Sequence, residues 1–458
     1  MYLSYTAVVV ALSHFYFNQL TNSHLMQTII HSLDYEGRGV ARVDGKTIFV
    51  ENALPLEVAD IAIMQDKGSF ALAHAQRIVQ SSPYRREPAC PHYGNCGGCA
   101  LQHLEFSAQV AAKQRVFEEQ LQRIGKVQPK QLLPPIYGSA WHYRSRTRLA
   151  ISLDWAGEVQ IGYQAKRSKK IVPISQCAVL PERISSSLHT IRAGLQAIHR
   201  AAPKIRMQHV DILAGNHITV LNIAADKPLP ANEVAQMQSS LQSQGKWQIW
   251  QQIGKRPAQA IAPKTAPELS YALPEFGLHM PFRVGDFTQI NLPMNEVMVS
   301  RAIRLLQPQA HERIADLFCG LGNFTLPIAR SGAQVIGIEG EDFLTQRATH
   351  NAQQNGLHNI EFSTADLFDT TPQTIEQLDY FDKMLLDPPR AGAYAVVQAL
   401  HAPYLPKRIV YVSCNPATFA RDAAVLVGKG YRFSAAGIMN LFPHTAHVEA
   451  MAVFDLNG

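Results

Sequence analysis

The chain has 458 residues, of which 47% are hydrophobic and 17% charged, and it carries a formal net charge of +6. This length predicts two to four domains, and the mild positive charge permits a polyanionic partner without requiring one. Six cysteines in so long a chain exclude the disulfide framework of a small secreted domain. Because three of them lie between Cys90 and Cys99, they indicate a metal site in a reducing cytosol, and we expect a cytoplasmic protein.

The N-terminus carries a short apolar run, Ala7–Leu12, with no Lys or Arg before Arg38. A signal peptide needs a basic region before its apolar segment, and a membrane span needs about 20 apolar residues. We therefore expect no signal peptide, no anchor and no membrane partner. Residues 1–25 are predicted to be a disordered or misassigned leader, with Met26 as a candidate start.

Residues 26–80 contain short β-rich segments separated by glycine turns, which predicts a small β-barrel. The predicted strands are Gln27–Leu33, Thr47–Val50 and Val58–Met64. The block from Asp34 to Gly45, followed by Ile48–Pro55, resembles the TRAM domain, an OB-like RNA-binding module of RNA-modifying enzymes. That family usually has Gly after the proline, where this chain has Leu56, so the tight turn is the part of the motif that does not match.

Residues 81–275 form the predicted middle domain, which opens with the spacing Cys90-x5-Cys96-x2-Cys99. Two glycines between the last two cysteines let the backbone wrap closely around an ion or cluster. A tetrahedral site needs a fourth thiolate, and Cys177 is the only other cysteine before the C-terminal domain. The spacing leaves a four-cysteine zinc site and an iron–sulfur cluster both open, with unligated thiols as a third interpretation.

The loop from Cys96 to Leu104, Cys-Gly-Gly-Cys-Ala-Leu-Gln-His-Leu, closely resembles the cluster loop of RlmD-type 23S ribosomal RNA uracil-5-methyltransferases. The family usually has Gln where this chain has Ala100. The resemblance implies a 4Fe-4S cluster, with these ligands: Cys90, Cys96, Cys99 and Cys177. Methyl transfer does not require cluster chemistry, so we expect the cluster to support folding or to position RNA.

Apolar residues at helical spacing follow the loop and predict an amphipathic packing helix with no chemistry of its own: Phe106, Val110, Phe117, Leu121 and Ile124. Further on, alternation at period two places three arginines on one face of a strand: Arg144, Arg146 and Arg148. That face is either a basic stripe for a phosphate backbone or a merely solvated surface. Residues 238–267 are polar and are predicted to be variable surface.

From residue 276 to 458, short apolar strands alternate with helical segments, which predicts an α/β fold with a doubly wound parallel sheet. The predicted strands are Ile314–Phe318, Gln334–Ile338, Ile360–Ser363, Lys383–Leu386 and Ile409–Ser413. Gly320 and Gly322 allow close approach of a ligand, and Glu339 ends the second strand, where a carboxylate can accept hydrogen bonds from ribose hydroxyls. With no third glycine, the pattern resembles the Rossmann-like S-adenosylmethionine fold rather than a dinucleotide site.

This resemblance implies a set of residues that bind S-adenosylmethionine: Gln289, Phe318, Asn323, Glu339, Asp366 and Asp387. Gln289 would close over the methionine moiety, and Asp366 would lie near the adenine. Asp387 would lie in the pocket near the cofactor and the target base. Cys319 is expected only to pack.

The strand Ile409–Ser413 breaks at Asn415-Pro416 and leaves Cys414 at the carboxyl edge of the sheet, where open parallel sheets bind ligands. Such a thiol is either a small buried hydrophobe or a nucleophile. Over residues 314–451, including Phe442–Glu449, the chain resembles uracil-5-methyltransferases. In that family the thiol corresponding to Cys414 would add to C6 of a flipped uridine, and Glu449 would remove the C5 proton; otherwise Glu449 is a strand-end carboxylate in an ion pair.

The resemblance implies 23S ribosomal RNA as the partner, with no obligate protein partner. The barrel and the long middle domain favour this RNA over transfer RNA, while the modified uridine stays open. The alternatives are action on another ribosomal or transfer RNA site, a non-catalytic RNA-binding assembly factor, and a redox protein that uses the cluster.

Overall fold

The computed structural model describes residues 25–457, so the leader predicted over residues 1–25 lies, except for Leu25, outside the described residues. The described chain forms two compact units. The first takes in the residues up to Glu87 together with Ala100–Ala108, and the second takes in Pro88–Cys99 and everything from Gln109 onward. Within residues 25–457, none of the helices has the length and apolar character needed to cross a bilayer.

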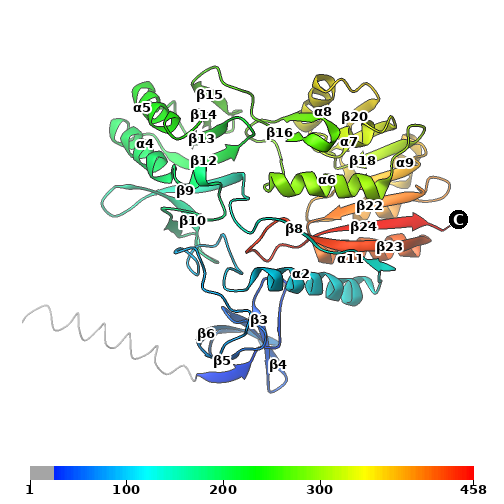
Figure 1. The fold of residues 1–458 in the computed structure, drawn as a ribbon, viewed down its shortest axis with the longest axis horizontal. Helices are drawn as coiled ribbons and strands as arrows, with labels where there is room; N and C mark the ends of the chain where they lie inside the picture. The colour runs from blue at the N-terminus through cyan, green and yellow to red at the C-terminus, as the bar shows by residue number, and fades with distance from the viewer. Residues whose placement is uncertain (1–24, 458) are drawn as a thin grey trace, which may run out of the picture. The chain divides into compact units, whose positions relative to one another are not determined.

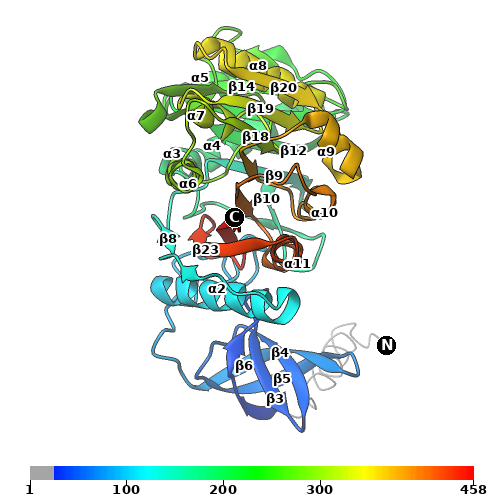
Figure 2. The same ribbon diagram turned by 90° about the vertical axis from the view of Figure 1, so that its right-hand side faces the viewer.

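The first unit is built on a six-stranded sheet with the order β1-β5-β6-β4-β3-β2 (Figure 2). Its strands are β1 Met26–Ile29, β2 Ser32–Leu33, β3 Gly39–Val43, β4 Lys46–Glu51, β5 Val58–Asp66 and β6 Phe70–Gln80. The three predicted segments fall on β1, β2, β4 and β5, but β3 and β6 were not predicted. In β6 the buried positions are alanines, Ala71, Ala73 and Ala75, whose low β-propensity hides the alternation from a sequence reading.

The tight turn of the first unit forms although Leu56 replaces the usual glycine. Leu56 has a φ of +71°, in the left-handed region that favours glycine, and its N–H donates to Ile30 O at 2.9 Å. The next residue, Glu57, is fully buried, accepts from Leu54 N at 2.8 Å and pairs with Arg85. These contacts hold the turn in place.

The second unit contains a seven-stranded sheet with the order β11-β10-β9-β12-β13-β14-β15. Its strands are β9 Arg146–Leu153, β10 Val159–Gln164, β11 Ile171–Pro173, β12 Met207–Ala214, β13 Thr219–Ala225, β14 Trp247–Ile253 and β15 Gln259–Ala262. Its helices are α3 Glu182–Ser185, α4 Leu188–Ala201 and α5 Ala231–Gln242. Helices α4 and α5 lie side by side against this sheet (Figure 1).

The prediction that residues 238–267 are variable surface was wrong, because they include the end of α5 and the strands β14 and β15. Strand β14 pairs in parallel with β13 over seven residues, and Trp247 and Ile249 are buried in the core below α4 and α5.

The second sheet of this unit has the order β20-β19-β18-β21-β22-β24-β23-β7, with β8 also paired to β23. Its strands are β7 Gln131–Leu132, β8 Ile136–Tyr137, β18 Arg313–Leu317, β19 Gln334–Glu339, β20 Ile360–Thr364, β21 Lys383–Leu386, β22 Arg408–Ser413, β23 Tyr431–Asn440 and β24 Glu449–Leu456. All neighbours from β20 to β22 are parallel, and β24 is antiparallel to both β22 and β23. The predicted doubly wound α/β sheet and its five strands are confirmed.

Helices cover both faces of this sheet (Figures 1 and 2). One face carries α2 Phe106–Gln120, the π-helical turn η1 Leu121–Gly125, α9 Pro372–Leu378, α10 Tyr394–Ala399 and α11 Pro416–Gly428. The other carries α6 Leu292–Leu306, α7 Thr325–Ala329, α8 Asp342–Gln354 and the hairpin β16 Ser270–Leu273 with β17 Leu278–Pro281. Short 3-10 turns lie at η2 Pro274–Phe276 and η3 Leu367–Asp369.

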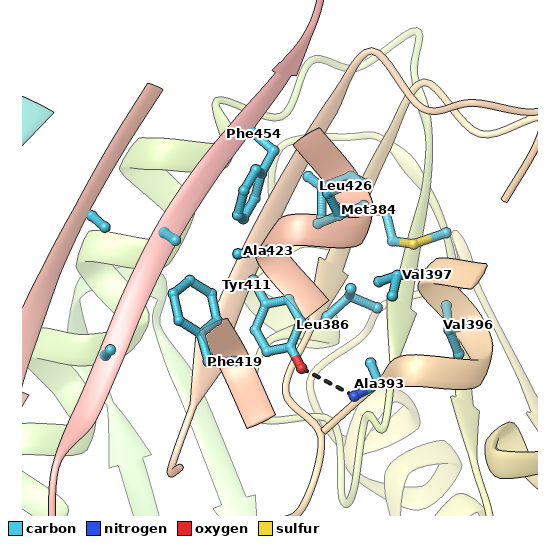
Figure 3. Close-up of a cluster of buried hydrophobic side chains, with 14 of the residues drawn as sticks. Met384, Leu386, Ala393, Val396, Val397, Tyr411, Phe419, Ala423, Leu426 and Phe454 are labelled. Atoms are coloured by element: carbon cyan, nitrogen blue, oxygen red, sulfur yellow. Dashed lines mark hydrogen bonds between the residues drawn. The ribbon is translucent and has the colours of Figure 1, made fainter. Parts of the chain in front are cut away.

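Alternate residues of each strand serve the two cores. On β22, Ile409 and Tyr411 face the α10–α11 side, whereas Val410 and Val412 face the α6 side. Figure 3 shows Tyr411 and Phe419 packed in the first of these cores. Both faces of the sheet are thus apolar, which leaves the ends of the strands as the place for polar chemistry.

Helix α2 is the packing helix that the sequence predicted. Phe117 is fully buried and stacks on Phe419 of α11, with ring centroids 5.7 Å apart. Ile124, which was assigned to the same face, is instead 46% exposed beyond the helix end. The buried face also carries two polar residues, Gln109 and Lys113.

Candidate active site

The carboxyl ends of the parallel strands meet at one edge of the nine-stranded sheet. The register pairs Leu317 of β18 with both Ile338 of β19 and Leu386 of β21, and pairs Leu386 with Tyr411 of β22. The predicted site residues at or just beyond these strand ends are Phe318, Glu339, Asp366, Asp387 and Cys414. They therefore gather at the edge where open parallel sheets bind ligands.

Cys414 and Glu449 are brought together by the antiparallel pairing of β22 with β24. Ser413 pairs with Ala450, so the next residue, Cys414, stands beside Glu449 at the start of β24. Burial, reinforced by the carboxyls of Glu449 and Asp387, raises the pKa of Cys414 to about 12. Burial and the charge of Asp387 also raise the pKa of Glu449 well above its usual range. Both groups therefore favour their uncharged forms at neutral pH.

Hydrogen bonds join the turn that carries Cys414 to the loop that carries Asp387. Asn415 caps α11 by accepting from Ala417 N at 3.1 Å, and its Nδ2 donates to Arg390 O at 3.0 Å. The hydroxyl of Thr418 donates to the same carbonyl at 3.1 Å. These bonds fix the two loops as one unit around the thiol.

The loop after β18 and the end of β19 offer groups that fit an adenosine. Phe318 has a φ of +66°, and its ring centroid lies 5.8 Å from that of Phe368, a residue that the sequence analysis missed. Glu339 Oε2 accepts from Gly320 N at 3.0 Å. A Cβ built on Gly320 would meet no described atom within 4 Å, so there is open space above the loop. Aromatic rings suit a purine, and the carboxylate suits ribose hydroxyls.

Carboxyl groups crowd the same edge. Burial, with a contribution from the charge of Glu339, raises the pKa of Asp316 to about 7. Burial, with contributions from Asp316 and Glu339, raises the pKa of Asp387 to about 8. A bound cation would relieve the repulsion between these carboxylates. This edge of the sheet therefore fits the positively charged sulfonium of S-adenosylmethionine.

The side chain of Asn323 serves as a brace within the second unit. Its Oδ1 accepts from Tyr271 OH at 2.8 Å and from Asn295 Nδ2 at 2.9 Å, and its Nδ2 donates to Asn295 Oδ1 at 2.9 Å. It thereby ties the glycine loop to α6 and β16, which leaves one Nδ2 hydrogen for a ligand.

Gln289 lies next to a hydrogen-bonded residue, whereas Asp366 caps a short 3-10 turn. Gln289 is partly buried, and the carbonyl of the next residue, Ile290, accepts from Ser145 N at 2.8 Å. Asp366 is exposed and caps η3 by accepting from Phe368 N at 2.9 Å.

Three of the four thiols predicted as ligands, Cys90, Cys96 and Cys177, influence one another electrostatically in the second unit. Cys96 bridges to Ala165, just beyond β10, and Cys177 N donates to Ser185 Oγ at 2.9 Å. Burial is the largest cause that raises the pKa of Cys96 and of Cys177, and negative charge on Cys90 adds to both shifts. Across residues 25–457, no group of three or more His, Cys, Asp or Glu side chains has the geometry of a metal-ion site.

Of the three arginines predicted as a basic stripe, Arg146 and Arg148 share a face of β9, where they alternate with the buried Thr147, whereas Arg144 precedes the strand and forms an isolated bridge with Asn291. However, Arg148 pairs with Asp211 at 2.7 Å, and Arg146 Nη1 donates to Asp286 O at 2.8 Å. Arg144 Nε also donates to Arg146 O at 3.2 Å, so protein acceptors engage all three guanidinium groups.

Two polar residues of α2 reach the segment before Glu449, and the sequence analysis missed both. Gln109 Oε1 accepts from His444 N at 2.9 Å, and its Nε2 lies 3.1 Å from His444 Nδ1. Lys113 Nζ donates to Asn440 Oδ1 at 2.7 Å and to Phe442 O at 2.9 Å. The available signal was their spacing, because Gln109, Lys113 and Phe117 are four residues apart and share one helical face.

Comparison with known proteins places most of the chain within described families. A family model described as tRNA (Uracil-5-)-methyltransferase matches residues 105–455, and the TRAM domain model matches residues 27–75. A 23S rRNA (uracil(1939)-C(5))-methyltransferase RlmD of Neisseria lactamica is 52% identical over 431 residues, which cover 93% of this chain and 95% of the relative. The RlmD of Dechloromonas aromatica is 50% identical over 93% of this chain and 99% of its own length.

A solved structure has the same fold. The Pyrococcus abyssi tRNA (uracil-54, C5)-methyltransferase in complex with S-adenosyl-L-homocysteine superposes with a TM-score of 0.71. It is 24% identical, and the match covers 94% of this chain and 100% of that structure.

Proposed function

The chain belongs to the tRNA (uracil-5-)-methyltransferase family, as an RlmD-type 23S rRNA uracil-C5-methyltransferase, and from this we propose that it methylates C5 of uridine 1939. The activity depends on S-adenosylmethionine. The observation that carries the proposed mechanism is the pairing of Ser413 with Ala450, which sets the Cys414 thiol beside the Glu449 carboxyl. Since the substrate is ribosomal RNA, we also propose a cytoplasmic location.

The chemistry starts from a uracil ring whose C5 is not nucleophilic. The target uridine leaves its stack and enters the pocket. The Cys414 thiolate forms a bond to C6, and the electron pair of the C5=C6 bond moves onto C5 and the C4 carbonyl. S-adenosylmethionine, when bound, supplies an electrophilic methyl group to that carbon, with S-adenosylhomocysteine as the leaving group. Glu449 then accepts the C5 proton, the C5=C6 bond re-forms, and the sulfur–C6 bond breaks to release Cys414 as thiolate.

The cofactor is proposed to lie across the strand ends. Phe318 would contact the adenine and Glu339 the ribose, while Asp366 would lie at the adenine margin. Gln289 and Asn323 would contact the methionine side, and Asp387 would lie between the cofactor and the base. The support is the donor set at this edge: an aromatic pair, a carboxylate and an open glycine loop.

The cysteine loop is proposed to hold a 4Fe-4S cluster, with these ligands: Cys90, Cys96, Cys99 and Cys177. The support is the electrostatic influence of Cys90 on Cys96 and on Cys177, which indicates that these thiols lie near one another. The cluster would hold the 88–99 loop on the sheet that carries β10, and the TRAM barrel would contribute to RNA binding.

The proposal is tested with unmodified ribosomal RNA and methyl-labelled cofactor. Cys414→Ala should abolish methyl transfer, because nothing then adds to C6. Glu449→Gln should slow turnover by about 10²–10⁴-fold and let a covalent RNA–protein adduct accumulate on denaturing gels. The matched control is Glu361→Gln, at an exposed carboxylate of β20, which should behave as wild type. Normal turnover in either site variant contradicts the role given, and a non-catalytic RNA binder would transfer no label at all.

A further inference from the structure

Lys113 is a buried amine that the proposed reaction does not use. Its residue is 2% exposed, and its Nζ donates to two uncharged oxygens, Asn440 Oδ1 and Phe442 O. A buried ammonium is costly unless a negative charge lies near enough to stabilise it. Its burial therefore indicates that a negatively charged group lies near Lys113.

Hydrogen bonds place the Lys113 amine at the end of β23, where the connection that leads to Glu449 begins. Met439 of β23 pairs with Glu449 of β24, and Asn440, the acceptor of Lys113, is the next residue of β23. Phe442, whose carbonyl is the second acceptor, lies in the connection that leads to Glu449. Helix α2 thus anchors the end of β23, and Lys113 and Glu449 lie near enough for each charge to affect the other.

The charged and titratable groups around this pair come from three other segments: Asp387 and Arg390 after β21, Cys414 after β22, and His444 and His447 before β24. Burial and nearby positive charge lower the pKa of each histidine to about 4, so both are neutral at pH 7. Of these groups, Arg390 and Lys113 are the two that supply positive charge.

Lys113 and Arg390 differ in their surroundings. Both favour the ionised form of Glu449, against the burial and the Asp387 charge that oppose it. Arg390 is exposed, whereas Lys113 is buried, and a charge acts more strongly where water is excluded. Burial lowers the pKa of Lys113 to about 7, and the charge of Glu449 opposes this shift. Part of the amine is therefore protonated at neutral pH.

We propose that Lys113 is a positioning residue for proton removal from C5, whose ammonium favours the ionised form of Glu449 against burial and so raises the fraction of Glu449 that is ready to accept the proton. This inference rests on the proposed function, because it presupposes Glu449 as the base. In this role Lys113 contacts neither the uracil ring nor the cofactor, and it acts through Glu449.

The experiment measures the resolution of the covalent adduct in single turnovers between pH 6 and 10, in the full-length protein with ribosomal RNA and labelled cofactor. Lys113→Met removes the charge and keeps the length of the side chain. Without the ammonium, Glu449 ionises at a higher pH, so resolution at pH 7 should slow about 10-fold or more. The rise of rate with pH should move upward by about one unit, and the rates should converge at high pH.

Gln109→Met is the matched control. It removes another buried polar side chain from the same helix, one that holds His444 of the same connection, but it removes no charge. It should change the rate of resolution without moving the pH profile. Lys113→Gln, which can still donate hydrogen bonds, should reproduce the shift of Lys113→Met and guards against a folding defect in that variant.

The outcomes separate the two proposals. If Glu449→Gln accumulates adduct while both Lys113 variants resolve it at the wild-type rate with an unshifted profile, the role of Lys113 is overturned and the proposed function stands. If Glu449→Gln accumulates no adduct and turns over normally, the proposed base is wrong. A pH shift of equal size in Gln109→Met would also overturn the inference, because loop position rather than charge would then explain it.

Discussion

At the scale of single residues, Leu56 holds a backbone conformation that suits glycine, with a φ of +71° and a side chain that is 61% exposed. The left-handed conformation costs a residue with a Cβ about 1 kcal/mol. Leu56→Gly should therefore stabilise the barrel unit by up to about that amount, measured by urea unfolding of the full chain. Val79→Gly, at an exposed position of β6, is the control and should destabilise. Equal losses in both variants would show that Leu56 is unstrained.

Some residues with a proposed role lie next to a sequence pattern that predicts them, and others do not. Cys414 and Glu449 lie beside strong local patterns, a buried strand that breaks at Asn415-Pro416 and the segment from Phe442 to Glu449, so both could be predicted. Lys113 could not. Its amine binds Asn440, 327 residues further along the chain, and the sequence around Lys113 does not predict that contact.

At the scale of elements, a buried network joins β22, α11 and the start of α10. Tyr411 OH donates to Asp422 Oδ2 at 2.7 Å, and Ala393 N donates to the same oxygen at 2.8 Å. Ala393 N also lies 3.0 Å from the Tyr411 oxygen, as Figure 3 shows. The network fixes the loop after Asp387 to the helix that follows Cys414.

Tyr411→Phe should lower the free energy of unfolding by about 1–2 kcal/mol, because a hydrogen bond is lost and Asp422 stays buried with fewer donors. Thermal or urea unfolding measures the loss. Tyr394→Phe, at an exposed tyrosine of α10, is the control and should change stability by less than about 0.5 kcal/mol. Equal stability of the two variants would contradict the structural role of the network.

One strand that the sequence analysis missed, β14, has polar residues at buried positions. Strand β14 contains Gln248 and Gln251, and their amides donate to the carbonyls of Pro263 at 2.9 Å and Lys227 at 2.6 Å. Tertiary hydrogen bonds of this kind make a glutamine-rich strand possible, and composition alone does not reveal them. The strands of the parallel sheet are apolar on both faces, so their sequence identifies them.

At the scale of the whole molecule, the proposed cluster would connect the 88–99 loop to Cys177 across a long stretch of chain. Cys177→Ser should abolish the visible absorbance of anaerobically purified protein and increase hydrogen exchange in residues 88–99. Binding of S-adenosylhomocysteine should be unchanged, because the strand-end residues that would hold it contain none of the four thiols. Cys319→Ser is the control and should retain the absorbance. Full absorbance in Cys177→Ser would remove that residue from the ligand set.

The adjacency of Cys414 and Glu449 is a matter of strand register, and it makes this part of the protein sensitive to length rather than to composition. If the pairing of Ser413 with Ala450 is kept, one residue inserted between Glu449 and Ala450 would move Glu449 one place along the chain and turn its side chain to the opposite face of the sheet. Glu449 would then point away from the sulfur even though every amino acid needed for the reaction was still present. The number of residues at the start of this strand is therefore as necessary to the proposed reaction as their identity.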